Sequence, residues 1–146
     1  MECNIVTVPT KPPKIAKAEY ETLAALRYAL RRFLRFSEEA AHAAGLTPQQ
    51  HQALLAIKGF PGRDYITISE LAERLQLRHH STVGLVDRLV ASRLAARTRD
   101  PTDRRQVRLA LTARGETLLE KLSSAHKEQL RRMSPQIELL LERLRG

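Results

Sequence analysis

The sequence predicts a mainly α-helical protein that contains one small β-hairpin. Along most of the 146 residues, apolar side chains recur at steps of three and four, which is typical of helices that bury one face. Between residues 94 and 111 the period changes to two, where Val107, Leu109 and Leu111 alternate with other residues. Two T-x-x-E/Q sequences in the middle of the chain mark helix starts, because such sequences form capping boxes.

The N-terminal part is predicted to be a flexible arm followed by a long helix. Residues 1–15 contain three prolines and no periodic pattern, so we expect an irregular arm. From about residue 16 to residue 44 the apolar residues follow a helical period, and Gly45 ends the helix. We assign residues 16–45 as a dimerisation helix.

Three shorter helices follow, and the first two have clear start signals. The first comes after the capping box Thr47–Gln50 and ends near Gly59. The second comes after a short β-prone stretch and the capping box Thr67–Glu70, and is predicted over residues 68–76. A tight turn separates it from the third helix, which we expect over residues 80–92.

A basic hairpin and more helix complete the chain. We predict strands over residues 94–99 and 106–111, joined by the segment 100–105, which opens with the turn-forming pair Asp-Pro. Thr112 is placed to cap the next helix. Because the residue before a proline disfavours the helical conformation, we expect Pro135 to interrupt this helix and a short last helix to follow.

The charge of the chain points to a polyanionic partner. The 25 Lys and Arg residues exceed the 16 Asp and Glu residues by nine. Residues 76–108 hold eight arginines, three aspartates and no lysine, which gives this segment more than half of the excess charge. Arginine is the planar, bidentate donor that suits phosphate and guanine.

The order of these elements predicts a winged helix-turn-helix. The helices over 68–76 and 80–92, with their tight turn, form a helix-turn-helix whose second helix would enter the major groove of duplex DNA. The arginine-tipped hairpin beside it would reach the backbone or the minor groove. We therefore assign residues 46–112 as the DNA-binding domain and 113–146 as C-terminal dimerisation helices.

Four segments resemble the MarR family of bacterial transcriptional regulators. They are I-S-E-L-A-E-R-L at residues 68–75, L-V-D-R-L at 85–89, D-P-T-D-R-R at 100–105 and L-A-L-T-A-R-G at 109–115. The resemblance implies a homodimer whose terminal helices interlock and whose two winged domains read a pseudo-palindromic operator, with repression as the expected outcome. The apolar surface of the first and last helices agrees, since it exceeds what one small domain can cover.

The resemblance also assigns roles on the second helix of the helix-turn-helix. It places His79, His80, Ser81 and Val83 near the bases, with Thr82 turned inward. Arg78 occupies a turn position where a small capping residue is usual, and Arg88 is placed for phosphate contact. The family usually has polar or basic residues where this chain has Val83 and Gly84. Val83 is suited to a thymine methyl group, and Gly84 to a close backbone approach.

The wing of the family carries a D-x-R pattern that corresponds here to Asp103 and Arg105. The resemblance implies that Asp103 orients Arg105, which enters the minor groove, with Arg104 as the neighbouring candidate. The alternative is that Asp103 only closes the turn of the hairpin.

The family also binds small effectors, often aromatic and anionic, between its dimerisation and winged parts. The resemblance suggests five residues of the first two helices for such a site: Arg27, Tyr28, Arg31, His42 and His51. The alternative is that these residues serve packing and the surface.

Other functions find little support in the sequence. The five histidines lack the spacing of a metal site, and no catalytic or cofactor motif has a supporting context, so we expect neither an enzyme nor a cofactor. No apolar run is long enough to span a membrane, and Cys3 has no partner for an internal disulfide, which together predict a cytoplasmic protein, associated with the bacterial nucleoid when bound to DNA. Two alternatives remain: a nonspecific architectural nucleic-acid-binding protein and a helical interaction module.

Overall fold

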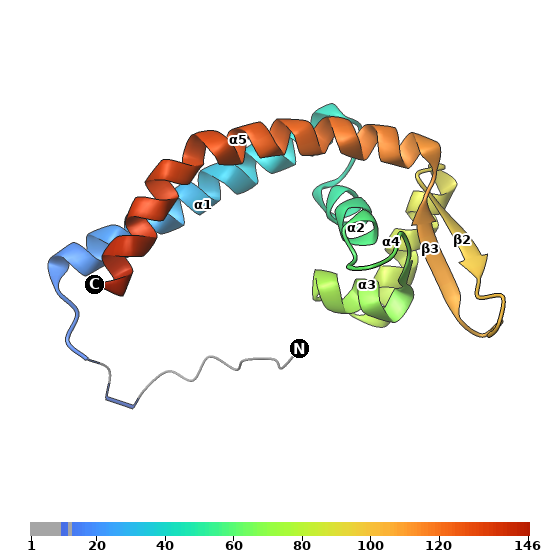
Figure 1. Cartoon of the computed structure of the whole chain (residues 1–146), viewed down its shortest axis with the longest axis horizontal. Helices are drawn as coiled ribbons and strands as arrows, with labels where there is room; N and C mark the ends of the chain where they lie inside the picture. Colours follow the sequence, from blue (N-terminus) through green and yellow to red (C-terminus); the bar gives the residue numbers. More distant parts are fainter. Residues whose placement is uncertain (1–9, 12) are drawn as a thin grey trace.

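The computed structural model describes residues 10–11 and 13–146 and shows a helical chain with one small sheet (Figure 1). The fold class predicted from the sequence is thereby confirmed. The elements in chain order are α1 (Lys17–Ala43), α2 (Pro48–Lys58), β1 (Ile66–Thr67), α3 (Ile68–Leu75), α4 (His79–Ala91), β2 (Ala95–Arg99), β3 (Val107–Leu111) and α5 (Ala113–Arg145).

The sheet is antiparallel and has the strand order β1-β3-β2. β2 and β3 form the predicted hairpin, with Ala95 opposite Leu111 and Arg99 opposite Val107. The β-prone stretch before α3 pairs with the other edge of β3 through only two residues, Ile66 and Thr67. The sheet therefore attaches the hairpin to the start of α3.

One hydrophobic core joins the helix-turn-helix to the sheet. It takes side chains from every element, so that burial of apolar surface fixes α2, α3, α4 and the sheet as one body. Its largest fully buried apolar side chains are Leu54, Ile57, Ile66, Leu71, Leu85, Leu89, Leu94 and Leu109.

Both predicted capping boxes are present, and each satisfies two backbone N–H groups that the first turn of a helix leaves free. At the start of α2, the Thr47 hydroxyl accepts from the Gln50 N–H at 3.1 Å, and the Gln50 side chain accepts from the Thr47 N–H at 3.0 Å. Thr67 and Glu70 make the same exchange at the start of α3. The capping signal thus predicted the start of both helices correctly.

The prediction that Pro135 interrupts the last helix is wrong, because α5 continues through it to Arg145 as one helix. A proline removes one backbone hydrogen bond and crowds the preceding turn, which costs about 3 kcal/mol in a helix interior. Packing against α1 on both sides of this position offsets that cost. His126 contacts Ser37 before the proline, and Leu140 is buried after it. The C-terminal segment is therefore one long helix rather than two.

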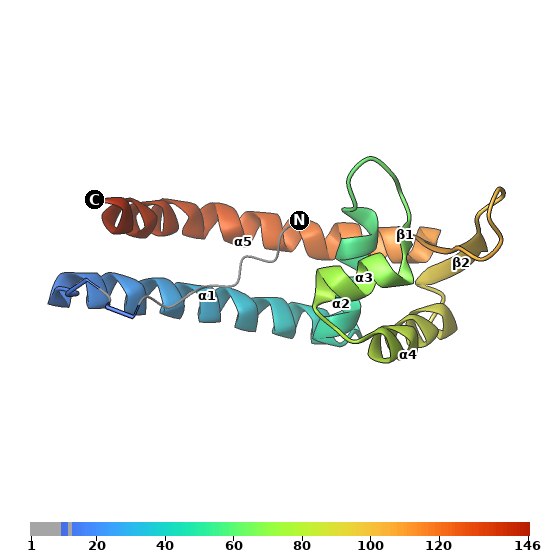
Figure 2. The same cartoon turned by 90° about the horizontal axis from the view of Figure 1, so that it is seen from below.

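Helices α1 and α5 lie side by side and antiparallel, and they extend as an arm beyond the winged domain (Figure 2). Leucines remain exposed on both helices: Leu23, Leu30, Leu34, Leu130, Leu139, Leu141 and Leu144. No helix in the described part of the chain is long and apolar enough to cross a membrane. Cys3 and most of the predicted flexible arm, residues 1–15, lie outside the described residues.

Two histidines meet where the arm joins the winged domain. The rings of His51 from α2 and His126 from α5 lie 4.7 Å apart, and His126 Nε2 is 2.8 Å from the Ser37 hydroxyl of α1. His126 Nδ1 lies 2.6 Å from the Leu122 carbonyl, which can only accept, so Nδ1 carries the proton. Burial lowers the pKa of His51 below its ordinary value, and the neighbouring His126 lowers that pKa further.

We expect the free energy of unfolding to decrease as the pH falls below about 6.5, the ordinary histidine pKa. Because the pKa of His51 is lower in the folded chain than in the unfolded chain, the unfolded chain binds the proton more readily in this range. Urea unfolding at several pH values would measure the effect. The His51→Leu variant should lose part of the pH dependence, whereas His79→Gln, at an exposed position, should retain all of it. If the free energy of unfolding changed with pH equally in the wild type and in His51→Leu, His51 would not be the group responsible.

Candidate nucleic-acid interface

The first turn of α4 presents its polar side chains to solvent. His79, His80 and Ser81 are exposed, whereas Thr82 is fully buried. The Thr82 hydroxyl donates to the Arg78 carbonyl oxygen at 3.0 Å, which satisfies this buried group and fixes the start of the helix. Arg78 holds the capping position without a side-chain cap, which leaves its exposed side chain free of that role.

The next turn of α4 is less accessible. Val83 and Gly84 are half-buried, and Arg88 is exposed one turn further along the helix. A Cβ atom added to Gly84 would meet only the Arg88 guanidinium, at 3.7 Å, so the fold itself does not require glycine there. The lack of a side chain at Gly84 is therefore compatible with the close backbone approach that the sequence suggests.

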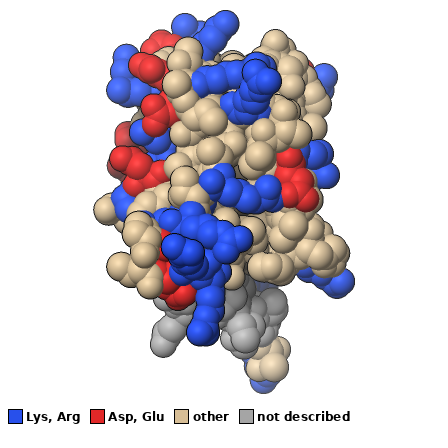
Figure 3. Space-filling model, turned by 90° about the vertical axis from the view of Figure 1, so that its right-hand side faces the viewer, with Lys and Arg blue, Asp and Glu red and all other residues tan. Residues whose placement is uncertain are grey.

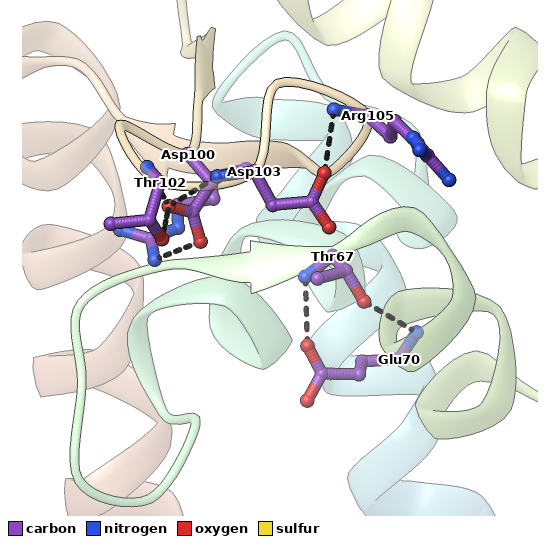
Figure 4. Close-up of polar contacts among 7 residues, drawn as sticks. Thr67, Glu70, Asp100, Thr102, Asp103 and Arg105 are labelled. Atoms are coloured by element: carbon purple, nitrogen blue, oxygen red, sulfur yellow. Dashed lines mark hydrogen bonds and ion pairs between the residues drawn. The ribbon is translucent and has the colours of Figure 1, made fainter.

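The hairpin loop is organised around the Asp100 carboxylate. Its Oδ1 accepts from the Thr102 hydroxyl at 2.7 Å, from the Thr102 N–H at 2.8 Å and from the Asp103 N–H at 3.3 Å (Figure 4). Its Oδ2 forms an ion pair with Arg108 at 2.7 Å. The hydrogen bonds from Thr102, followed by those from Asp103 and the charge of Arg108, lower the pKa of Asp100 to about 2. The loop is thus held by a carboxylate that stays ionised.

Asp103 contacts the main chain of Arg105 rather than its guanidinium. Its Oδ1 accepts from the Arg105 N–H at 3.1 Å, and the Arg105 side chain extends away from it (Figure 4). Arg104 is tied to the opposite strand through its carbonyl oxygen, which accepts from Arg99 at 3.3 Å. Asp103 therefore fixes the loop at Arg105, while the guanidinium groups of Arg104 and Arg105 pair with no group of the described residues.

Two of the eight arginines in residues 76–108 form ion pairs within the described protein. Arg97 pairs with Asp87 and links β2 to α4, and Arg108 pairs with Asp100. Counting arginines in the sequence does not distinguish these two from the other six, because their acidic partners come from other elements. Figure 3 shows Lys and Arg side chains grouped on the end of the molecule that carries the wing. The other six arginines are exposed: Arg78, Arg88, Arg93, Arg99, Arg104 and Arg105.

One hollow lies between α4 and the wing, the two parts that the sequence predicts to contact DNA. It measures about 400 Å³ and lies between the starts of α3 and α4 and the wing. Its lining includes both His79 of α4 and Arg105 of the wing, together with Ser69 and Gln106, which the sequence analysis did not single out. A polyanion that crosses this hollow would meet the recognition helix and the wing at once.

The five effector candidates do not line one cavity in the described chain. Arg31 and His42 line a groove of about 530 Å³ formed by α1 alone, which also carries Arg35 and the acidic Glu38 and Glu39. The remaining candidates lie elsewhere: Tyr28 in a separate groove between α1 and α5, Arg27 on the surface of α1, and His51 in the interior. Within the described residues, no group of three or more His, Cys, Asp or Glu is placed to hold a metal ion.

Comparison with known proteins finds similarity to HTH-type transcriptional regulators over the central part of the chain. Residues 44–106 match the model of the MarR family. Over 68 residues the chain is 37% identical to the uncharacterized HTH-type transcriptional regulator YsmB of Bacillus subtilis (strain 168). This match covers 47% of this chain and 47% of YsmB. The chain is 32% identical over 89 residues to the HTH-type transcriptional repressor MdtR of the same organism, which is 61% of this chain and 56% of MdtR. The chain thus spans about half the length of the curated relatives it matches.

A solved structure extends the likeness in fold to nearly the whole chain. A point mutant of S. aureus MepR bound to an oligodeoxyribonucleotide superposes with a TM-score of 0.65 over 90% of this chain and 92% of that chain, at 20% sequence identity. The shared part includes the terminal helices as well as the winged helix-turn-helix, and this confirms the predicted fold.

Proposed function

We propose that the chain is a MarR-family transcriptional regulator that binds double-stranded DNA in a sequence-specific manner, because its central part matches the model of that family and its relatives are named HTH-type transcriptional regulators. The observation that carries the proposal is the hollow lined by both His79 and Arg105. MepR, which shares the fold, has been solved with an oligodeoxyribonucleotide, and MdtR is named a repressor. We therefore propose repression. The names of the relatives describe regulators and not enzymes, in agreement with the prediction.

In this proposal α4 lies in the major groove and the wing follows the minor groove. His79, His80 and Ser81 would read base edges from the first turn, and Val83 would contact a thymine methyl group. Arg78 and Arg88 would bind phosphates on either side. Arg105, with Arg104 beside it, would enter a narrow minor groove, where the negative potential attracts arginine.

We propose that two copies act together. The exposed leucines of α1 and α5 form an apolar surface on an arm that one winged domain does not cover, and such a surface favours association. A two-fold dimer would present two reading heads to half-sites separated by about one helical turn, roughly 34 Å. The operator would then be pseudo-palindromic.

Regulation by a small anionic effector is part of the proposal. The groove that contains Arg31, Arg35 and His42 is formed by one helix only, so a second copy would have to complete it. Titration of a small aromatic carboxylate such as benzoate into the protein–DNA complex tests this. Release of the duplex supports the site, and unchanged binding at saturating benzoate contradicts it for this ligand class.

Selection of bound sequences from random duplex DNA tests the main proposal. A sequence-specific dimer should enrich a two-fold symmetric motif and keep it in the presence of excess competitor DNA. Binding without enrichment would instead favour the nonspecific architectural protein, for which the best support is that Val83 and Gly84 stand where the family usually has polar or basic residues. No mobility shift of any duplex at low salt would leave only the helical interaction module.

The Arg105→Ala variant is expected to bind the selected duplex roughly tenfold more weakly, with a salt slope reduced by about one. The reason is that Arg105 is exposed at the loop tip, and Asp103 holds only its main chain. Fluorescence anisotropy between 50 and 300 mM salt measures both quantities. Arg145→Ala, at the far end of α5, is the matched control and should bind like the wild type. An unchanged salt slope for Arg105→Ala would remove the wing from the interface.

A further inference from the structure

A stack of alternating guanidinium groups and aromatic rings connects α3 to the wing. The Arg74 Cζ lies 5.0 Å from the Phe60 ring centroid, and the Arg63 Cζ lies 4.2 Å from the same ring. The Arg63 Cζ also lies 4.7 Å from the centroid of the Tyr65 ring, which the Arg108 Cζ approaches to 4.1 Å. We call these five residues the stacking ladder. All four distances are within cation–π range.

Ion pairs anchor the ladder to two defined points of the fold. Arg63 pairs with Glu70, the residue that completes the capping box of α3. Arg108 pairs with Asp100, the residue that organises the hairpin loop. The Tyr65 ring lies between these two arginines and is the link that joins the two halves. The start of the helix-turn-helix is thereby connected to the base of the wing.

Two of the three arginines of the ladder are mostly withdrawn from solvent, whereas Arg74 at its α3 end is exposed. The side chains of Arg63 and Arg108 are each 25% exposed. The Nε of Arg108 is buried and has no hydrogen-bond partner among the described residues. An unpaired buried donor is unfavourable, and contact of its planar guanidinium with the Tyr65 ring is the compensating interaction that the structure offers.

Backbone pairing alone restrains the wing weakly on this side. β1 pairs with β3 through two residues only, Ile66 opposite Leu109 and Thr67 opposite Arg108. The loop that carries Arg104 and Arg105 extends beyond the paired part of the hairpin, so a small rotation at its base displaces the tip (Figure 2). Side-chain contacts at the base therefore determine where the tip lies relative to α4.

We propose that Tyr65 is a positioning residue that, through Arg108 and Asp100, holds the wing at the angle to α4 at which both reach the same duplex. This rests on the proposed function, because the angle matters only if both parts contact DNA. Tyr65 itself makes no contact with DNA in this proposal. Its effect is transmitted by the ladder to Arg105.

Amide hydrogen exchange of the free protein tests the positioning role without DNA. Tyr65→Leu removes the stacking surface, and Tyr65→Phe keeps the ring as the matched control. We expect amides of residues 99–108 to exchange at least tenfold faster in Tyr65→Leu, while those of Tyr65→Phe and the core amides of α4 stay as in the wild type. Unchanged exchange in the wing would overturn the proposal. If Tyr65→Leu fails to fold, Arg108→Lys provides the test, because it keeps the charge near Asp100 but loses the planar stack.

A double-mutant cycle on the selected duplex then tests the route to DNA. Tyr65→Leu alone should weaken binding about as much as Arg105→Ala and remove the minor-groove part of the hydroxyl-radical footprint, with the contacts of α4 retained. In the Arg105→Ala background it should add less than a twofold loss, because both changes act through the same contact. Full additivity would overturn the proposal. If the wild type binds no duplex, the proposed function fails, whereas the exchange experiment still decides whether Tyr65 holds the wing.

Discussion

Replacing Gly115 by alanine is expected to destabilise the fold by at least about 3 kcal/mol, since a buried side chain here has no room and the main chain must move. Gly115 is buried in the first turn of α5, where that helix crosses the start of β2. A Cβ atom added there would overlap the carbonyl oxygen of Leu94 and lie 3.0 Å from its carbonyl carbon. Both atoms are backbone, so no side chain can rotate away to relieve the collision.

The backbone around Gly115 is fixed by several hydrogen bonds. The Thr112 N–H donates to the Leu94 carbonyl at 3.1 Å, and its hydroxyl donates to the Arg93 carbonyl at 2.6 Å. That hydroxyl also accepts from the Gly115 N–H at 3.0 Å and caps α5. Arg93 itself has a φ of 60°, a left-handed conformation that is uncommon for a residue other than glycine. Any shift that makes room for a methyl group therefore disrupts these contacts together.

Urea or thermal unfolding of Gly115→Ala, at equal protein concentration, measures the loss. Gly84→Ala, on helix α4, is the matched control, because its added Cβ meets only a flexible guanidinium at 3.7 Å. Alanine there should be neutral or stabilising by up to about 1 kcal/mol through its higher helix propensity. Equal stability of the two variants would show that α5 does not approach β2 as closely as described.

The parts of the fold that were predictable from the sequence are those encoded by neighbouring residues. The capping boxes at Thr47 and Thr67, the Thr112 cap and the alternating strand at 107–111 all depend on contacts within a few residues of each other. The prediction at Pro135 is wrong for the complementary reason. The local rule predicts a break, but contacts with α1, about a hundred residues earlier in the chain, keep α5 continuous.

The candidate site shows the same division. The exposed first turn of α4 and the arginine tip of the wing follow from their position in the pattern. The ion pairs of Arg97 and Arg108 within the protein do not follow from that pattern. The aspartates that pair with them, and the Tyr65 ring that contacts Arg108, come from other elements. The effector candidates were grouped by a resemblance alone, and the folded chain places them on different surfaces. A sequence supplies residue types and local geometry, but the partners of a side chain depend on tertiary packing.

A protein that carries both Leu23→Glu and Leu30→Glu is expected to be a folded monomer with DNA affinity reduced roughly 10²- to 10⁴-fold, the gain that linked binding sites supply. The two leucines are 46% and 44% exposed and lie seven residues apart, on one face of α1. In a single chain the glutamates would stay in water at little cost. In the proposed dimer they would be buried without a counter-charge, and this would separate the copies.

Light scattering and anisotropy on the same samples connect the arm to DNA binding. Leu55→Glu is the matched control, because Leu55 is 45% exposed but lies on α2, outside the arm. It should leave the dimer and the DNA affinity unchanged, whereas the double variant should lose both together and bind half-site and full-site duplexes equally. A double variant that remains dimeric would place the interface elsewhere on the chain. One that is monomeric yet binds the full site as tightly as the wild type would show that each winged domain reads its half-site alone, so that the leucines on α1 and α5 serve another partner.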